Sequence, residues 1–125
     1  MKFKFIIERT KTGYSAYERK LPIYTSADTI QVLRINAFEA VNLYKEETNK
    51  KATKIDDITF EIDFKQFFEY YKVLNSKYLA KRIGMNESLL SQYVNGKKNP
   101  SKKQIDRIID GLHEIGKELT ELILV

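Results

Sequence analysis

The chain has no cysteine and only one histidine among its 125 residues. Disulfides, thiol catalysis and cysteine-ligated zinc are therefore excluded, and neither a histidine-rich metal site nor a histidine-based catalytic triad is expected. Apolar runs are short, as at Phe5–Ile7, so the sequence predicts no transmembrane helix and no signal peptide. We expect a cytoplasmic protein that needs no metal or other cofactor and binds no membrane.

The composition that remains is globular, and its charge is uneven. Lysine and arginine number 22 against 17 acidic residues, which gives a net charge of +5. Between Lys77 and Lys103 seven basic residues accompany a single acid, Glu87, whereas the last 22 residues hold five acids and two basic residues. Such a local excess of positive charge predicts a polyanionic partner, although a solvated lysine-rich face has the same pattern.

The first half of the chain predicts a small sheet. Apolar and polar residues alternate along Lys2–Glu8 and again along Ile58–Asp63, as they do in strands with one buried face. Turn residues at Thr10–Gly13, where glycine accepts positive φ, join the first strand to a second at Tyr14–Tyr17. Ile23–Thr25 is a candidate third strand.

One helix is predicted between these strands. Asp28 or Thr29 is a suitable N-cap, and apolar residues then recur at spacings of three and four as far as Glu47. The polar stretch Asn49–Asp57 predicts a loop. The order of elements predicts an α+β domain over residues 1–63, with a small antiparallel sheet and one packed helix.

From Phe64 the apolar period becomes helical, which predicts an all-α domain of four to five helices over residues 64–125. Gly111 and Gly116 lower the helix propensity of the last segment. Residues 101–120 are therefore expected to form either two separate helices, at 101–110 and 112–120, or one continuous helix. The apolar end, Leu122–Val125, predicts a short strand. The predicted helices cover residues 64–74, 76–83, 87–94, 101–110 and 112–120, and Asn86 and Ser101 are the expected N-caps of the third and fourth of them.

The segment that begins at Ser76 fits a helix–turn–helix. Such a unit needs a small residue where its helices touch, here Ala80, and a glycine that turns the chain, here Gly84. An ordinary helical hairpin uses the same glycine and is the alternative interpretation. The interior positions of the unit fall on Leu79, Ala80, Ile83, Gly84, Met85, Leu90 and Tyr93.

The second helix of a helix–turn–helix lies in the DNA major groove. Glutamine pairs with adenine, glutamate accepts a hydrogen bond from cytosine, and serine bonds to several bases, so the outward residues are candidates for base contact. Polar residues at helix ends and the lysines that follow are candidates for phosphate contact. The candidate base-reading residues are Glu87, Ser88, Ser91 and Gln92. The candidate phosphate-binding residues are Ser76, Asn86, Asn95, Lys97, Lys98 and Lys102.

This second half resembles the Cro/repressor-type helix–turn–helix. The resemblance is carried by Leu79–Met85 and by Leu90–Ser101, which ends in Asn-Gly-Lys-x-x-Pro-Ser. In that family the residues that match Glu87, Ser88 and Gln92 face bases. Glu87 departs from the family's usual neutral or basic residue.

The first half resembles the HicB antitoxin family and its partial ribonuclease-H-like fold. The matching segments are Lys2–Glu8, Gly13–Tyr17, Leu21-Pro22 and Asp28-Thr29, together with Asn36, Glu39, Ala40, Leu43 and Tyr44 in the predicted helix. The family's Gly-Cys after Leu-Pro is replaced by Ile23-Tyr24. The resemblance implies an antitoxin of a HicA/HicB-like pair. It would mask a small HicA-like ribonuclease toxin, bind a double-stranded operator and form a homodimer or higher homo-oligomer.

Two other functions compete with this interpretation. A ribonuclease-H-type enzyme would need several carboxylates around two metal ions. The first strand carries only Glu8, and Asp56 and Asp57 fall in a predicted loop. Glu61 and Asp63 lie on a polar strand face. We therefore expect no enzyme, no catalytic residue and no metal site. The aromatic residues between Phe60 and Tyr71 have helical spacing, which favours packing over a stacking platform for single strands.

The second competing function is a stand-alone transcriptional regulator. Its first half would dimerise or sense a ligand, and DNA binding would be the same in both cases. Association with a small basic protein encoded beside the gene distinguishes the two interpretations.

Overall fold

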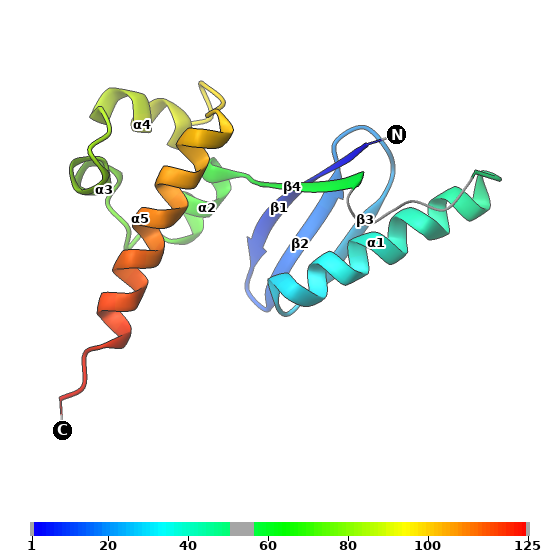
Figure 1. Cartoon of the computed structure of the whole chain (residues 1–125), viewed down its shortest axis with the longest axis horizontal. Coiled ribbons are helices and arrows are strands. Elements are labelled where there is room, and N and C mark those ends of the chain that lie inside the picture. Colours follow the sequence, from blue (N-terminus) through cyan, green and yellow to red (C-terminus); the bar gives the residue numbers. More distant parts are fainter. Residues whose placement is uncertain (1, 51–56, 125) are drawn as a thin grey trace. The chain divides into compact units, whose positions relative to one another are not determined.

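The chain folds into two units, Met1–Tyr70 and Tyr71–Val125. The structure is a computed structural model and describes residues 2–50 and 57–124. A sheet with a long helix forms most of the first unit, and helices form the second (Figure 1). The α+β class predicted from the sequence is confirmed. None of the helices in the described ranges is both long and apolar enough to cross a membrane.

The sheet of the first unit is mixed rather than purely antiparallel. Its strands are β1 (Phe3–Thr10), β2 (Gly13–Glu18), β3 (Tyr24–Ala27) and β4 (Ile58–Ile62), in the order β3-β2-β1-β4. The first three strands form an antiparallel meander, but β4 pairs with β1 in parallel. The predicted antiparallel sheet was wrong in this one pair, because the chain passes through a helix between β3 and β4 and returns in the direction of β1.

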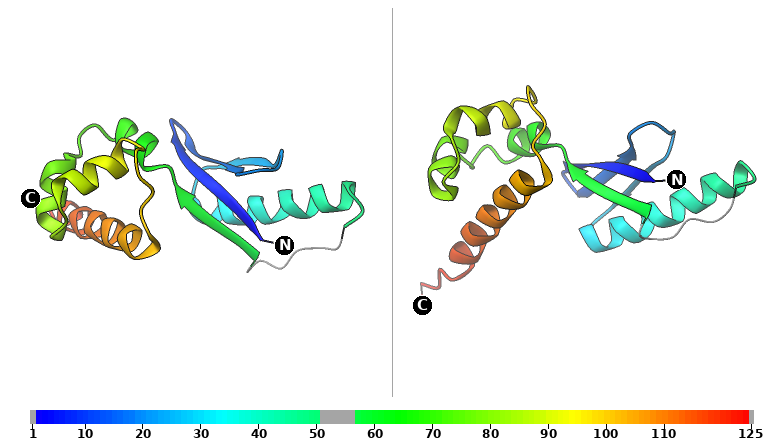
Figure 2. Two further views of the ribbon diagram at one scale, coloured as in Figure 1. Left: turned by 90° about the horizontal axis from the view of Figure 1, so that it is seen from above. Right: turned by 45° about the horizontal axis from the view of Figure 1, so that its top comes forward.

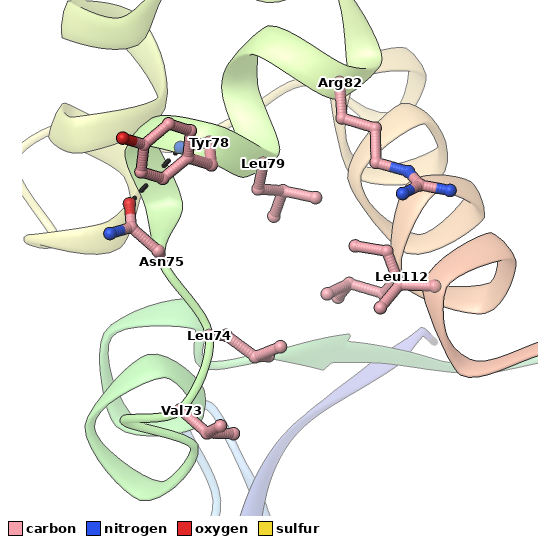
Figure 3. A pocket seen from close by; sticks show the side chains of 8 residues that line it. Val73, Leu74, Asn75, Tyr78, Leu79, Arg82 and Leu112 are labelled. Carbon is pink, nitrogen blue, oxygen red and sulfur yellow. Dashed lines mark hydrogen bonds between the residues drawn. The ribbon is translucent and has the colours of Figure 1, made fainter. Parts of the chain in front are cut away.

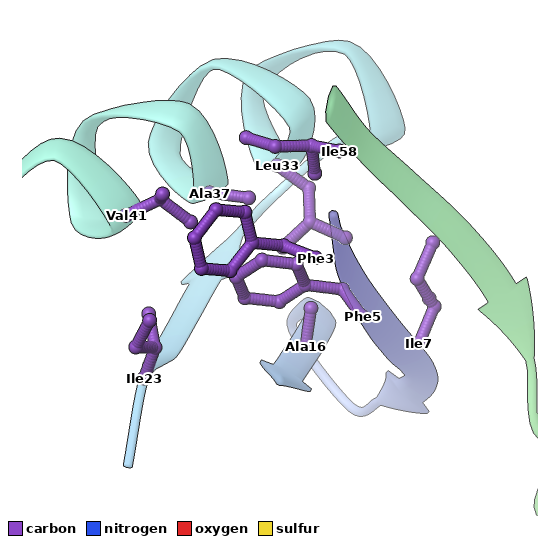
Figure 4. Close-up of a cluster of buried hydrophobic side chains, with 9 residues drawn as sticks. All are labelled: Phe3, Phe5, Ile7, Ala16, Ile23, Leu33, Ala37, Val41 and Ile58. Atoms are coloured by element: carbon purple, nitrogen blue, oxygen red, sulfur yellow. The ribbon is translucent and has the colours of Figure 1, made fainter. Parts of the chain in front are cut away.

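The helix α1 (Ile30–Glu47) packs on one face of this sheet (Figure 2). Thr29 is its N-cap, since Oγ1 accepts a hydrogen bond from the backbone N–H of Val32 at 3.2 Å. Thr29, and not Asp28, therefore begins the helix. Burial of apolar surface holds the two layers together. The core comprises Phe3, Phe5, Ile7, Ala16, Ile23, Leu33, Ala37, Val41 and Ile58 (Figure 4).

Gly13 is needed for space and not for positive φ. A Cβ atom at this position would lie 2.3 Å from the carbonyl oxygen of Ala27, which is far inside van der Waals contact. Among the described glycines only Gly84 and Gly96 have positive φ. The expected role of Gly13 in a positive-φ turn was therefore wrong, because β3 approaches β2 too closely at Gly13 for any side chain.

The first unit extends past the predicted boundary at residue 63. The helix α2 (Phe64–Tyr70) belongs to it, because the Gln66 side chain pairs with the β1 backbone at Arg9. Oε1 of Gln66 accepts from the Arg9 N–H at 2.8 Å, and Nε2 donates to the Arg9 carbonyl at 2.7 Å. Phe64 and Phe68 are buried. The division into units therefore falls at Tyr70.

The second unit contains α3 (Ser76–Ile83), α4 (Glu87–Val94) and α5 (Lys102–Thr120). Ser101 caps α5 as expected, with its Oγ accepting from the Gln104 N–H at 3.3 Å. The helix is continuous through Gly111 and Gly116, so the second of the two expected alternatives is the one that forms. Residues 122–124 do not form the predicted strand, and Val125 lies outside the described residues.

Candidate nucleic-acid interface

The turn between α3 and α4 depends on Gly84. Its φ is +69°, in the left-handed region that glycine adopts at low cost. The N–H of Met85 donates to the carbonyl of Ala80 at 2.9 Å, which closes the end of α3. Asn86 then caps α4, with Oδ1 accepting from the Leu89 N–H at 3.1 Å. These contacts confirm the predicted turn and N-cap.

The interior of the helix–turn–helix is apolar. Five of the seven predicted interior residues are buried, whereas Ile83 is half-buried and Gly84 lies exposed in the turn. Ala80 is fully buried, which lets α3 and α4 approach closely at their crossing. The buried residues are Leu79, Ala80, Met85, Leu90 and Tyr93.

The outward face of α4 carries all four candidate base-reading residues. Ser88, Ser91 and Gln92 are exposed, and their spacing of three and four puts them on one face of the helix. Glu87 is also exposed, at the start of α4. This face is available to a partner, and contact with bases stays a prediction.

Glu87 has a partner within the chain. Its Oε1 lies 3.9 Å from Nζ of Lys81 on α3, and both side chains are largely solvated. The carboxylate also stands in the first turn of α4, where the helix dipole favours negative charge. Pairing with Lys81 reduces the repulsion between this carboxylate and a phosphate backbone.

The end of α4 and the following loop are held by local hydrogen bonds. Nδ2 of Asn95 donates to Oγ of Ser91 at 3.2 Å, so these two candidate side chains bond to each other. Gly96 has a φ of +74°, and the N–H groups of Lys97 and Lys98 donate to the carbonyl of Gln92 at 2.9 and 3.3 Å. The side chains of both lysines are exposed.

The remaining phosphate candidates lie at the starts of helices. Lys102 is the first residue of α5 and is exposed. Ser76 is the first residue of α3 and is half-buried, but Asn75 is the cap of that helix, with Oδ1 accepting from the Tyr78 N–H at 3.2 Å. The helix therefore begins at Ser76, as predicted, and Asn75 precedes it as the cap.

Sequence reasoning missed Arg107, which supports the turn from α5. Its Nη2 donates to the carbonyls of Ile83 at 2.9 Å and Gly84 at 3.0 Å, while Nη1 donates to Oε1 of Gln104 at 3.0 Å. Carbonyls at a helix C-terminus have no partner within the helix, so Arg107 satisfies two of them. The pattern of α5 contains no local signal for this contact.

The carboxylates considered for a nuclease have structural partners. Glu61 pairs with Lys4 at 2.9 Å, and Oδ1 of Asp63 accepts from the Gln66 N–H at 3.1 Å. Within residues 2–50 and 57–124 no three histidine, aspartate or glutamate side chains gather in a group that could hold a metal ion. Asp56 lies outside the described residues.

Comparison with known families identifies the second unit. Residues 74–114 match the model of a helix–turn–helix family, of the Cro/repressor type expected from the sequence. A search of the curated proteins found no match to this chain. The matched residues contain α3, the Gly84 turn, α4 and most of α5. The second unit is thus a DNA-binding domain of the kind found in transcriptional regulators.

Proposed function

We propose that this chain is the antitoxin of a HicA/HicB-like toxin–antitoxin pair and represses its own operon from the cytoplasm. The exposed face of Ser88, Ser91 and Gln92, followed directly by Lys97 and Lys98, is the observation that carries the repressor role. The second unit binds the operator through this face, and the first unit binds and masks a small basic ribonuclease toxin.

The geometry of α4 favours base readout over general attraction to DNA. Three of its outward residues have hydroxyl or amide side chains and the fourth, Glu87, has a carboxylate, and all of these groups form directional hydrogen bonds with base edges. The lysines lie beyond the end of α4, where they add affinity and fix the orientation of the helix on the duplex.

Two features of the first unit support toxin binding. The meander followed by a helix and a parallel strand agrees with the partial ribonuclease-H-like fold that the resemblance implies. In addition, the sheet face opposite α1 carries Tyr17 and Tyr24, which pair across β2 and β3 and are exposed. Partial burial and the nearby carboxylates of Glu8 and Asp63 raise the pKa of Tyr17. Two exposed tyrosines beside carboxylates offer contact area and hydrogen-bond acceptors to a protein partner.

The test is co-expression of the full chain with the small protein encoded beside it. We expect the two proteins to co-purify, and we expect Tyr17→Ala with Tyr24→Ala to weaken the complex at least tenfold. The matched control replaces Tyr78, an exposed tyrosine of the second unit, by alanine. A neighbour that does not bind contradicts the antitoxin role, and one that binds equally well to both variants contradicts the tyrosine pair as its contact surface.

A stand-alone transcriptional regulator is the second candidate. The helix–turn–helix family match over residues 74–114 favours this second candidate, because the match concerns DNA binding alone. A chain that shifts its upstream DNA but binds no neighbouring protein would have this function.

We also propose that the chain is not an enzyme. Asp63 caps α2 and Glu61 pairs with Lys4, so both carboxylates have structural roles that do not require a metal ion. The purified chain is expected to show no Mg²⁺-dependent cleavage of RNA or DNA in a gel assay. Cleavage that disappears in Asp63→Asn but not in Asp28→Asn would contradict this proposal.

A further inference from the structure

A lysine of α3 lies between two side chains at the junction of α3 and α4. Nζ of Lys81 is 3.9 Å from Oε1 of Glu87 and 5.2 Å from the centre of the Tyr78 ring. Tyr78 lies in the first turn of α3, where its N–H donates to Oδ1 of Asn75 (Figure 3). The ammonium group therefore contacts a carboxylate and an aromatic face at once, and both contacts attract a cation.

These contacts add little to the stability of the free protein. The side chains of Lys81 and Glu87 are 57% and 45% exposed, and ion pairs with this degree of exposure are weak in water. The pair becomes more important beside DNA, because the phosphate backbone repels a carboxylate that has no cation next to it. A contact that contributes little to folding can therefore contribute much to DNA binding.

The ion pair also leaves Glu87 able to contact a base. Glu87 is the first residue of α4, and the N-terminal residues of the second helix are those that reach base edges in a helix–turn–helix. A carboxylate has two oxygens and accepts several hydrogen bonds, so a carboxylate that is paired with a lysine can still accept from the amino group of cytosine.

We propose that Lys81 is a positioning residue for Glu87. It holds the carboxylate at the start of α4, and the held carboxylate selects a C·G base pair at one position of the DNA site. Without Lys81 the phosphates repel the unpaired carboxylate, so that both the affinity and the preference for cytosine fall. This role rests on the operator binding proposed above, and it does not depend on a toxin.

The first experiment selects the tightest-bound duplexes from a random DNA library, with the full chain and with single variants. The wild type is expected to select cytosine at one position, and Glu87→Gln and Lys81→Met are expected to lose this preference with the other positions unchanged. Lys81→Arg keeps the charge and is expected to retain the preference. Lys77→Met is the matched control, since Lys77 is an exposed lysine one turn earlier on α3.

A double-mutant cycle on the selected duplex then measures the coupling of the two side chains. Lys81→Met is expected to weaken binding about fivefold more in the wild type than in Glu87→Gln, because only the former leaves an unpaired carboxylate beside the phosphates. Lys77→Met is expected to weaken binding equally in both backgrounds. Chemical denaturation is expected to give Lys81→Met the stability of the wild type, which excludes unfolding as the cause of weaker binding.

A Lys81→Met variant that still selects cytosine overturns the proposal. Losses that simply add in the cycle of Lys81 and Glu87, as they do for Lys77, overturn it as well. In both cases a wild type with its own base preference leaves the proposed operator binding in place. A wild type that selects no sequence contradicts the base reading in the proposed function itself, and the role of Lys81 fails with it.

Discussion

Arg107 shows how one side chain holds the helix–turn–helix in place from outside it. The guanidinium lies on α5 and donates to two carbonyls at the end of α3, beside the Gly84 turn. Hydrogen bonds from a charged donor to such carbonyls contribute more than neutral ones, and the planar guanidinium reaches both at once. The orientation of α4 therefore depends on a residue that does not belong to the helix–turn–helix itself.

We predict that Arg107→Ala lowers the free energy of unfolding by about 1–3 kcal/mol, because two C-terminal carbonyls of α3 lose their donor. Chemical denaturation of the full chain measures the change. Lys103→Ala is the control, since Lys103 is an exposed basic residue on the same helix. Equal stability of the two variants would show that the Arg107 contacts do not stabilise the domain.

Gln92 is the residue on which sequence-specific binding is expected to depend most. We predict that Gln92→Ala weakens operator binding by about 1–3 kcal/mol, which is the discrimination that one bidentate base contact provides. A gel-shift titration measures it, with Gln31→Ala as the control, because Gln31 is an exposed glutamine on α1. Unchanged affinity of Gln92→Ala would reject the docking of α4 in the major groove.

At the scale of elements, the two glycines of α5 have opposite environments. A Cβ atom at Gly111 would lie 2.3 Å from Cγ2 of Ile83, whereas one at Gly116 would meet nothing within 4 Å. Ile83 is β-branched and stands in a helix, so its χ1 angle has little freedom to move that methyl group away. Gly111 is thus required by the crossing of α3 and α5, and Gly116 is not.

This difference predicts opposite effects of one substitution. Gly111→Ala is expected to destabilise the chain by about 1–2 kcal/mol, since overpacking outweighs the better helix propensity of alanine. Gly116→Ala is expected to stabilise it by up to about 1 kcal/mol. Thermal unfolding of the wild type and of both variants measures the two changes. If Gly111→Ala stabilised the chain, α3 and α5 would be able to move slightly apart at this crossing without loss of stability.

The sequence predicted the elements that depend on neighbouring residues. Gly84 and Asn86 were identified as turn and cap because the rules for both act over a few residues. The contacts of Gln66 with Arg9 and of Arg107 with Ile83 join residues far apart in the sequence, so no local pattern predicts them. For the same reason the outward face of α4 was found in advance, but the support of its turn by α5 was not.

At the scale of the whole molecule, the basic and the acidic residues of the second unit lie in different parts of its sequence. The basic residues gather from α3 to the start of α5, and the acids gather in the remainder of α5. We therefore expect DNA to approach α4 and the lysines that follow it rather than the acidic half of α5.

The salt dependence of binding tests this separation. Each phosphate contact contributes about 0.9 to the slope of log affinity against log salt, so replacing both Lys97 and Lys98 by alanine is expected to flatten the slope by about 1–2. The control replaces Lys11 and Lys20, which are exposed in the first unit and change the net charge equally. Titration of operator DNA at several salt concentrations measures both variants. A slope that flattens in the control but not in the Lys97 and Lys98 variant would place the DNA on another surface. A lysine that contacts a phosphate displaces counterions on binding, so only the loss of such a lysine flattens the slope.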